Sequence, residues 1–475
     1  MCEFTDRLKR QSVWLAILAI ALAVWGLTDV RSRARTDPHN LGAHRSDLTC
    51  YTAAGAAIFA GQDPYEATNP RGWHYVYPPL LAILVAPLVP LDTQWQGVIW
   101  YAISLLAAWG CYAECRRIWR VLRTTDKPAT EPTIPNWLIW LTGAAMVLPT
   151  LNCLQRGQVG ILLTYFLLLG FRCVLTSRSV WTSLLGGVVL ALPVAIKVIP
   201  ALPVGCLCLL LFAVAAFRHW PAGFTWQASG VSSGVAAGLL LYFLIIPSFA
   251  IGSAANAKYL KTWLNLVLHG DQGEIDDDIT VHAIRNQSLS NAMYRLGNWA
   301  AHAFAGTQDD QSVDHVRASV AAREIVLPMD NFWARLTVRI LQAGMLALLL
   351  CYGWAAARRD NAWTLSSVFA LSCLLISAIS PVFRGHYYML WLPAVWIVPL
   401  YILRNGRPRL ATSLAICACA LIWIHYLLLP WAGRAGVLGL GASVWYVVAT
   451  ISVLRIKSPA SQQIEPATPR LLEAA

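Results

Sequence analysis

Residues 198–217 read VIPALPVGCLCLLLFAVAAF and contain no charged side chain. A helix needs about 20 predominantly apolar residues to cross a bilayer, so this stretch predicts a transmembrane helix. Similar blocks recur along the chain, and we therefore predict an all-α integral membrane protein with about twelve transmembrane helices. The expected crossings are 12–28, 95–115, 137–151, 158–176, 181–196, 198–217, 230–250, 336–357, 363–380, 387–403, 409–430 and 436–455.

The composition agrees with this class. Of the 475 residues, 57% are hydrophobic and 13% are charged, whereas soluble proteins usually carry about 25% charged residues. The 22 Trp suit the aromatic belts at membrane interfaces. The basic residues behind the net charge of +12 sit in short loops between apolar blocks, so we expect the lipid bilayer as a partner and no nucleic acid. Most Cys lie inside apolar blocks, where they act as small hydrophobes rather than as a disulfide framework.

The block Pro78–Leu91 decides the predicted topology. It is short and contains four prolines, which favours a re-entrant or interfacial segment over a crossing. If it does not cross, most basic loops fall on one side and the positive-inside rule places both termini in the cytoplasm. The arginines within 31–35 oppose this arrangement. The block 12–28 follows a basic start, but no cleavage site follows it, so we expect a retained first crossing rather than a signal peptide.

Two large loops then fall on the outer side. The first, 29–77, contains an Ala-rich stretch after Asp47 that predicts a surface helix. The second, 251–333, is acidic where the inner loops are basic, and its length suggests a functional loop. The tail 458–475 is expected to be disordered and cytoplasmic. Small residues at Gly186–Gly187 and within Gly230–Gly238 predict close helix packing.

The unusual polar motifs all lie on this outer side. Polar and charged groups near membrane depth are expensive, so their gathering at one face is a functional hypothesis. The motifs are Arg45-Ser46-Asp47, Gly61-Gln62-Asp63-Pro64-Tyr65, Gln155-Arg156-Gly157-Gln158, Lys197, Asn286-Gln287-Ser288 and Ser380–Tyr388.

Asp47 has two interpretations from the residues alone. It is either an acid at a helix N-terminus, stabilised by the helix dipole, or a general base that takes a proton from an attacking hydroxyl. The segment around Tyr65 is, in the structural alternative, an interfacial loop with a tyrosine belt. That alternative explains its Tyr and Pro but not the whole ordered string.

The ordered string carries a family resemblance. S-D-L-x-x-Y-x-x-A at 46–54, G-Q-D-P-Y at 61–65 and Y-x-Y-P-P-L at 75–80 resemble the first loop of the polytopic glycosyltransferases of family 87, within the GT-C superfamily. The resemblance covers about 12–430. Further matches follow in order at Gln155-Arg156-Gly157-Gln158, Ile196-Lys197-Val198-Ile199-Pro200, Asn286-Gln287-Ser288-Leu289, Ser380-Pro381 and His386-Tyr387.

The resemblance implies a GT-C membrane domain over 1–457 that transfers a hexose, mannose in particular. The implied donor is a polyprenyl-phosphate sugar, and the acceptor is a glycan, lipid or protein hydroxyl. The implied reaction is an inverting single displacement without a cofactor. A bacterial inner membrane is the expected location, with the active site on the outer face.

The matching positions receive roles from the resemblance. Asp47 is the expected catalytic base, and Asp63 is the rival, although an Asp-Pro turn gives Asp63 a good structural explanation. Lys197, Arg384 and His386 are expected to hold the donor phosphate, since cations stabilise a departing phosphate. The candidate substrate contacts are Tyr65, Gln155, Arg156, Gln158, Asn286, Gln287 and Tyr387.

Each of these positions also has a structural alternative. Lys197 can be a lysine that snorkels at a helix end, and His386 an interfacial histidine. Gln155–Gln158 and Asn286–Ser288 can be polar turns, and Asn286 also begins an Asn-x-Ser glycosylation pattern. The acidic run at 274–278 is more typical of a solvated face than of a metal site, so no metal is expected.

Two other classes of protein compete with a glycosyltransferase. The main alternative is a transporter or flippase of lipid-linked sugars, which usually shows internal repeats and polar sites near the midplane. The chain has no convincing repeat. A non-catalytic assembly factor is the other alternative, and it would not need a carboxylate beside a basic phosphate pocket.

Overall fold

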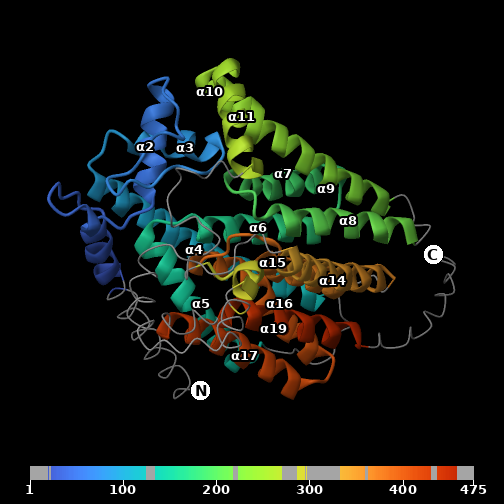
Figure 1. Ribbon diagram of the computed structural model, residues 1–475. Coiled ribbons are helices and arrows are strands. Elements are labelled where there is room, and N and C mark those ends of the chain that lie inside the picture. Colours follow the sequence, from blue (N-terminus) through green and yellow to red (C-terminus); the bar gives the residue numbers. More distant parts are fainter. Residues whose placement is uncertain are drawn as a thin grey trace, which may run out of the picture.

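The computed structural model describes residues 20, 23–124, 134–217, 223–269, 286–294, 296, 332–358, 362–428 and 436–456. Within these ranges the chain is helical, without a named strand (Figure 1). The α-helices are α2 (Leu48–Phe59), α3 (Pro79–Val85), α4 (Thr93–Thr124), α5 (Asn136–Arg156), α6 (Gly160–Leu175), α7 (Val180–Ile196), α8 (Ala201–Phe217), α9 (Gly223–Leu240), α10 (Ile246–Ile251), α11 (Ser253–His269), α14 (Phe332–Ala357), α15 (Ala362–Ile379), α16 (Leu392–Arg404), α17 (Pro408–Leu427) and α19 (Val437–Leu454). Short 3₁₀ turns are η1 (Leu41–Ala43), η2 (Ala86–Leu88) and η4 (Gly385–Trp391), and η3 (Leu241–Ile245) is a π-helical turn.

The helices are those of a multi-pass membrane protein. In the described part of the chain, eight are long and apolar enough to cross a membrane, namely α4, α5, Trp226–Ile251, α14, α15, Gly385–Arg404, α17 and α19. Three further expected crossings correspond to α6, α7 and α8, which have 16, 17 and 17 residues. At 1.5 Å per residue these span about 25 Å, less than the roughly 30 Å hydrocarbon core. The expected number of twelve is therefore not confirmed, and most of 12–28 lies outside the described residues.

The Pro78–Leu91 block forms the short helix α3 followed by η2. Pro79 occupies the first turn of α3, where a missing N–H costs nothing. Seven residues rise only about 10 Å, too little to cross a bilayer. The expectation of a short non-crossing segment agrees with this geometry.

The centre of the bundle is formed by α15 and the helix that follows it. About 83% of the apolar window of α15 and 94% of that of Gly385–Arg404 are buried, against 17% for Trp226–Ile251. The Trp226–Ile251 helix therefore lies at the periphery and exposes most of its apolar surface.

Asn256 donates a hydrogen bond of 2.9 Å to the Phe243 carbonyl within η3, which helps to satisfy the backbone where the helix widens.

Close packing of α7 on α9 follows from glycine, as the sequence predicts. A Cβ added at Gly187 would collide with the Val231 carbonyl oxygen, and one added at Gly234 would collide with the Leu184 carbonyl oxygen. Glycines on both helices thus allow the two backbones to touch, the small-residue packing common in membranes.

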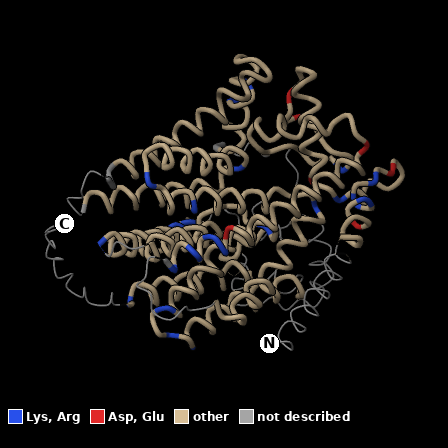
Figure 2. Tube along the Cα trace, turned by 180° about the vertical axis from the view of Figure 1, so that it is seen from behind, with Lys and Arg blue, Asp and Glu red and all other residues tan. Residues whose placement is uncertain are grey.

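Charged residues are sparse along the helices (Figure 2). Glu114 in α4 is fully buried, and it pairs with Arg172 of α6 and with Arg117 at 2.5 Å. A buried carboxylate is tolerated only when it is paired. The Glu114–Arg172 pair also joins α4 to α6. This ion pair was not among the features predicted from the sequence.

The described start of the second predicted outer loop, 251–269, lies beside the first. In Figure 1, α2 and α3 stand near α10 and α11 at one edge of the molecule. Tyr259 of α11 donates a 2.9 Å hydrogen bond to the Gln62 carbonyl in the first loop. The predicted surface helix is α2, and Gly61 follows it with φ of 73°. The tail 458–475 and most of the second loop lie outside the described residues.

Candidate active site

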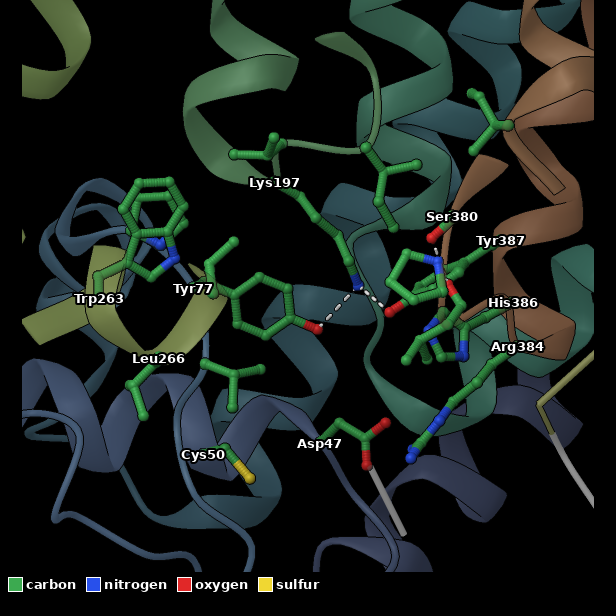
Figure 3. A pocket seen from close by; sticks show the side chains of 18 of the residues that line it. Asp47, Cys50, Tyr77, Lys197, Trp263, Leu266, Ser380, Arg384, His386 and Tyr387 are labelled. Carbon is green, nitrogen blue, oxygen red and sulfur yellow. Dashed lines mark hydrogen bonds between the residues drawn. The ribbon is translucent and has the colours of Figure 1, made fainter. Parts of the chain in front are cut away.

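A cavity of about 550 Å³ lies where the polar motifs meet (Figure 3). Its walls come from α2, the segment before α3, the end of α5, the turn between α7 and α8, α11, and the segment after α15. These elements are far apart in sequence, so tertiary packing alone brings them together. The cavity has a charged region and an apolar region.

The charged region contains three cations and one carboxylate. The cations are Lys197, Arg156 and Arg384, and the carboxylate is Asp47; His386 lies beside them. The apolar region is formed by the turn before α8 and by side chains of α8, α11 and α15. Its members are Val198, Ile199, Ala201, Leu202, Trp263, Leu266, Val267, Ile376 and Ile379.

Asp47 lies at the start of α2, but its side chain makes no capping hydrogen bond to the helix. Arg156 instead donates to the carboxylate twice, from Nε to Oδ2 at 3.2 Å and from Nη2 to Oδ1 at 3.3 Å. Gln158 Nε2 donates to Oδ2 as well. The side chain is 10% exposed and lines the cavity. Asp47 therefore lies at a helix N-terminus, but its side chain does not cap the helix with a hydrogen bond.

Gly157 explains how the Gln155–Gln158 turn reaches Asp47. It ends α5 in the left-handed region, with φ of 67°, where glycine is favoured. A Cβ at Gly157 would also press on the Leu48 side chain. The turn comes close enough for the Asp47 N–H to donate to the Arg156 carbonyl at 2.7 Å.

Lys197 ends α7 in an extended conformation and points into the cavity. Its Nζ donates to the Tyr77 hydroxyl at 3.2 Å and to the Tyr387 hydroxyl, as drawn in Figure 3. Both rings also face the ammonium, at 4.6 and 3.8 Å from their centroids. Burial lowers the pKa of Lys197 well below its usual value, nearby Arg384 lowers it further, and Asp47 opposes the shift.

Arg384 and His386 reach the same region from the segment between α15 and α16. The Arg384 Nη2 and His386 Nε2 atoms are buried, and neither has a hydrogen-bond partner among the described residues. Buried polar groups are usually paired, so these atoms favour a ligand that supplies acceptors. An anion beside Lys197 fits that requirement.

Comparison with known proteins agrees with these observations. The sequence model of glycosyltransferase family 87 matches residues 75–378, well over half of the chain. The chain belongs to glycosyltransferase family 87. This family is of the GT-C type, so the protein is a membrane glycosyltransferase. No curated protein and no solved structure matches the chain.

Several expected substrate contacts of this family 87 protein do not line the cavity. Asn286 accepts a 2.9 Å hydrogen bond from the Phe383 N–H and donates to the Pro381 carbonyl at 3.0 Å. The Gln287 N–H donates to the Phe383 carbonyl at 2.7 Å. The structure thus places these two residues behind the segment that carries Arg384, where they anchor it.

Three more expected contacts stand behind the wall or away from it. Tyr65 is buried, and its hydroxyl donates to the Tyr77 carbonyl at 3.2 Å. Gln155 is half-buried and does not line the cavity. Gln158 supports Asp47 from behind. Of the expected substrate contacts, Arg156 and Tyr387 do line the cavity.

Three aromatic residues of the site were not among the predicted positions. Tyr51 and Tyr77 link the carboxylate to the ammonium through hydroxyl groups, and Trp73 lines the cavity beside Arg156. Tyr51 and Tyr77 stand in the strings S-D-L-x-x-Y and Y-x-Y-P-P-L, so a signal for them was present in the sequence.

A metal centre finds no support in the described part of the family 87 chain. No three His, Cys, Asp or Glu side chains gather there in a way that could hold an ion. The acidic run 274–278, the earlier metal candidate, lies outside the described residues.

Proposed function

We propose that this family 87 protein transfers a hexose, mannose in particular, from a polyprenyl phosphate to a hydroxyl group of a glycan, lipid or protein. One observation carries the proposal: a single cavity joins an apolar region to three cations, of which Lys197 is buried, and to one carboxylate. A polyprenyl phosphate has the same division, since an apolar chain ends in an anion.

The cations are suited to the departing phosphate. As the acceptor oxygen bonds to the anomeric carbon, the bond from that carbon to the phosphate oxygen breaks and the phosphate keeps the electron pair. Lys197 and Arg384 supply positive charge where this negative charge develops, and His386 supplies a polar ring. Preorganised charge of this kind is often the largest single contribution to catalysis.

Asp47 is the proposed general base. It would take the proton of the acceptor hydroxyl as that oxygen attacks, and displacement from the face opposite the phosphate inverts the anomeric centre. Oδ2 accepts from both Arg156 and Gln158, whereas Oδ1 accepts from Arg156 alone among the described residues. A carboxylate oxygen has two lone pairs, so Oδ1 is the oxygen with room for the substrate proton.

The proposed location is a bacterial inner membrane with the cavity on the outer face. Single Cys residues at Asn40 and Arg407, both exposed, test this in a variant without native Cys. An impermeant thiol reagent added to intact cells should label Asn40→Cys and spare Arg407→Cys. The reverse pattern would place the cavity on the cytoplasmic side.

The activity itself is tested with purified protein and a panel of radiolabelled polyprenyl-phosphate sugars, with nucleotide sugars as a comparison. Transfer from polyprenyl-phosphate mannose to an alkyl glycoside, with none from the nucleotide sugars, is the expected result. Transfer from a nucleotide sugar alone would overturn the donor assignment. Movement of the labelled lipid across proteoliposomes without any transfer would support a flippase instead.

A further inference from the structure

The orientation of the Asp47 carboxylate depends on the neighbouring Gln158 amide, which must itself be held in one orientation. The Gln158 amide donates from Nε2 to Oδ2. A half-turn of the same amide would present its oxygen to the carboxylate, and two acceptors facing each other repel. Something must therefore hold the amide with its nitrogen toward Asp47.

Tyr51 is placed to do this. Its hydroxyl donates to Gln158 Oε1 at 3.3 Å, on the far side of the amide from Asp47. Asp47 and Tyr51 are four residues apart along the start of α2, a spacing that puts two side chains on the same face of a helix. One short helix thus presents both the carboxylate and the group that orients its hydrogen-bond donor.

Packing alone does not account for the Tyr51 hydroxyl. The side chain is 1% exposed, and its ring packs edge-on against Tyr75, Tyr77 and Trp100. Phenylalanine would fill the same space without the cost of burying a hydroxyl. Burial also raises the pKa of Tyr51 well above its usual value, so the hydroxyl keeps its proton and can act as a donor.

The same hydroxyl touches the phosphate side of the cavity. It lies 3.5 Å from the Tyr77 hydroxyl, which accepts a 3.2 Å hydrogen bond from Lys197. A continuous chain of polar atoms therefore runs from Asp47 through Gln158, Tyr51 and Tyr77 to Lys197. Tyr51 is its midpoint, in contact with Gln158 on one side and Tyr77 on the other.

We propose that Tyr51 is a positioning residue that acts through Gln158 to hold the Asp47 carboxylate ready for proton abstraction, and that it ties this orientation to the phosphate end of the cavity. This inference rests on the proposed function, because it needs Asp47 to be the base. Tyr51 itself touches no reacting atom. The proton passes from the acceptor hydroxyl to Asp47, and the electron pair leaves with the phosphate.

The test compares Tyr51→Phe with Tyr75→Phe, using polyprenyl-phosphate mannose as donor and octyl mannoside as acceptor. Tyr75 is the matched control, since its buried hydroxyl lies in the same aromatic cluster but, among the described residues, bonds only to backbone at Pro78 and Ala82. Tyr51→Phe should lower kcat about tenfold, the effect of one lost hydrogen bond, with the donor KM unchanged. Tyr75→Phe should lower the melting temperature without changing kcat.

A second variant gives a readout that a purely structural role would not change. Gln158→Glu places a carboxylate beside Asp47, and a like charge raises a carboxyl pKa. Because Asp47 must be ionised to act, the acid limb of the kcat/KM profile should move to higher pH. The Gln158→Asn variant keeps an amide, so the acid limb of its kcat/KM profile should lie near that of the wild type. Its kcat should still be lower, because the shorter side chain reaches less far.

The outcomes separate the two proposals. If the wild-type protein transfers no sugar from any polyprenyl phosphate, the proposed function fails. If the wild type is active, but Tyr51→Phe keeps its kcat and Gln158→Glu keeps its acid limb, the positioning role of Tyr51 is wrong and the proposed function stands. If Tyr51→Phe does not fold, the position of the acid limb in the Gln158→Glu kcat/KM profile decides the question.

Discussion

Arg156 at the end of α5 holds Asp47 at the start of α2 through both carboxylate oxygens, at 3.2 and 3.3 Å. The two residues are 109 positions apart in the chain, and each lies at the end of its helix. The pair joins the predicted first outer loop to the membrane bundle at the cavity. A carboxylate held in this way has a defined direction, which a general base requires.

Asp47→Asn is the most direct test of the base. Asn keeps the size of Asp and much of its hydrogen bonding but cannot take up the proton. A positioned general base contributes about 10²–10⁴-fold in rate, so transfer should fall by at least about a hundredfold while the protein still folds and inserts. Measurement of kcat on purified protein decides the question.

Asp63→Asn is the matched control for that variant. Asp63 is the rival acid in the same loop, and its side chain accepts the Tyr65 N–H at 3.0 Å, a bond that Asn can also make. Near-normal transfer is expected from Asp63→Asn. The opposite pattern, with Asp47→Asn active and Asp63→Asn inactive, would reassign the base.

Lys197→Ala and Arg384→Ala should weaken use of the donor more than use of the acceptor. Each removes a positive charge beside the departing phosphate, and a hydrogen bond to a charged group is worth about 1.5–3 kcal/mol. The expected loss is on the order of 10–100-fold in kcat/KM for the donor. Lys258→Ala on the exposed face of α11 is the control. Unchanged donor kinetics in both variants would favour a snorkelling lysine.

Donor use should depend on pH through Lys197. Burial lowers the pKa of this ammonium below 10.5, so rising pH removes its charge earlier than in an exposed lysine. Only the charged form attracts phosphate. The kcat/KM for the donor should therefore be intact below the lowered pKa and fall as the pH rises through it. The residual activity of Lys197→Ala should not show this fall at high pH. If the fall persists in Lys197→Ala, it belongs to the titration of another group.

Gly187→Val should destabilise the membrane bundle. The added side chain would meet the backbone of α9 at Val231, and overpacking of this kind typically costs about 1–3 kcal/mol. A lower melting temperature in detergent is the expected result. Gly205→Val is the control, because a Cβ at Gly205 meets no atom within 4 Å. Equal stability of the two variants would contradict the close contact of α7 and α9.

Most of the helices, the short α3 and close packing at the glycines of α7 and α9 were predictable from the sequence alone, whereas the contact of α7 with α9 was not. Long apolar blocks have few alternatives in a bilayer, where backbone polar groups must bond within a helix. Family membership was also visible, because the motifs S-D-L-x-x-Y and Y-x-Y-P-P-L are contiguous stretches of sequence. Asp47, Lys197, Arg384 and His386 were candidate site residues from the polar segments of the sequence, and all four line one cavity.

Only the tertiary structure decided which motif residues face that cavity. Asn286 and Gln287 anchor the segment of Arg384 from behind, Tyr65 supports Tyr77, and Tyr51 joins the carboxylate to the ammonium. The reason is physical: a motif records which residues occur near one another in sequence, whereas the direction of each side chain depends on how its helix is rotated and packed. Hydrogen bonds between residues more than a hundred positions apart, such as Arg156 to Asp47, exist only after that packing is complete.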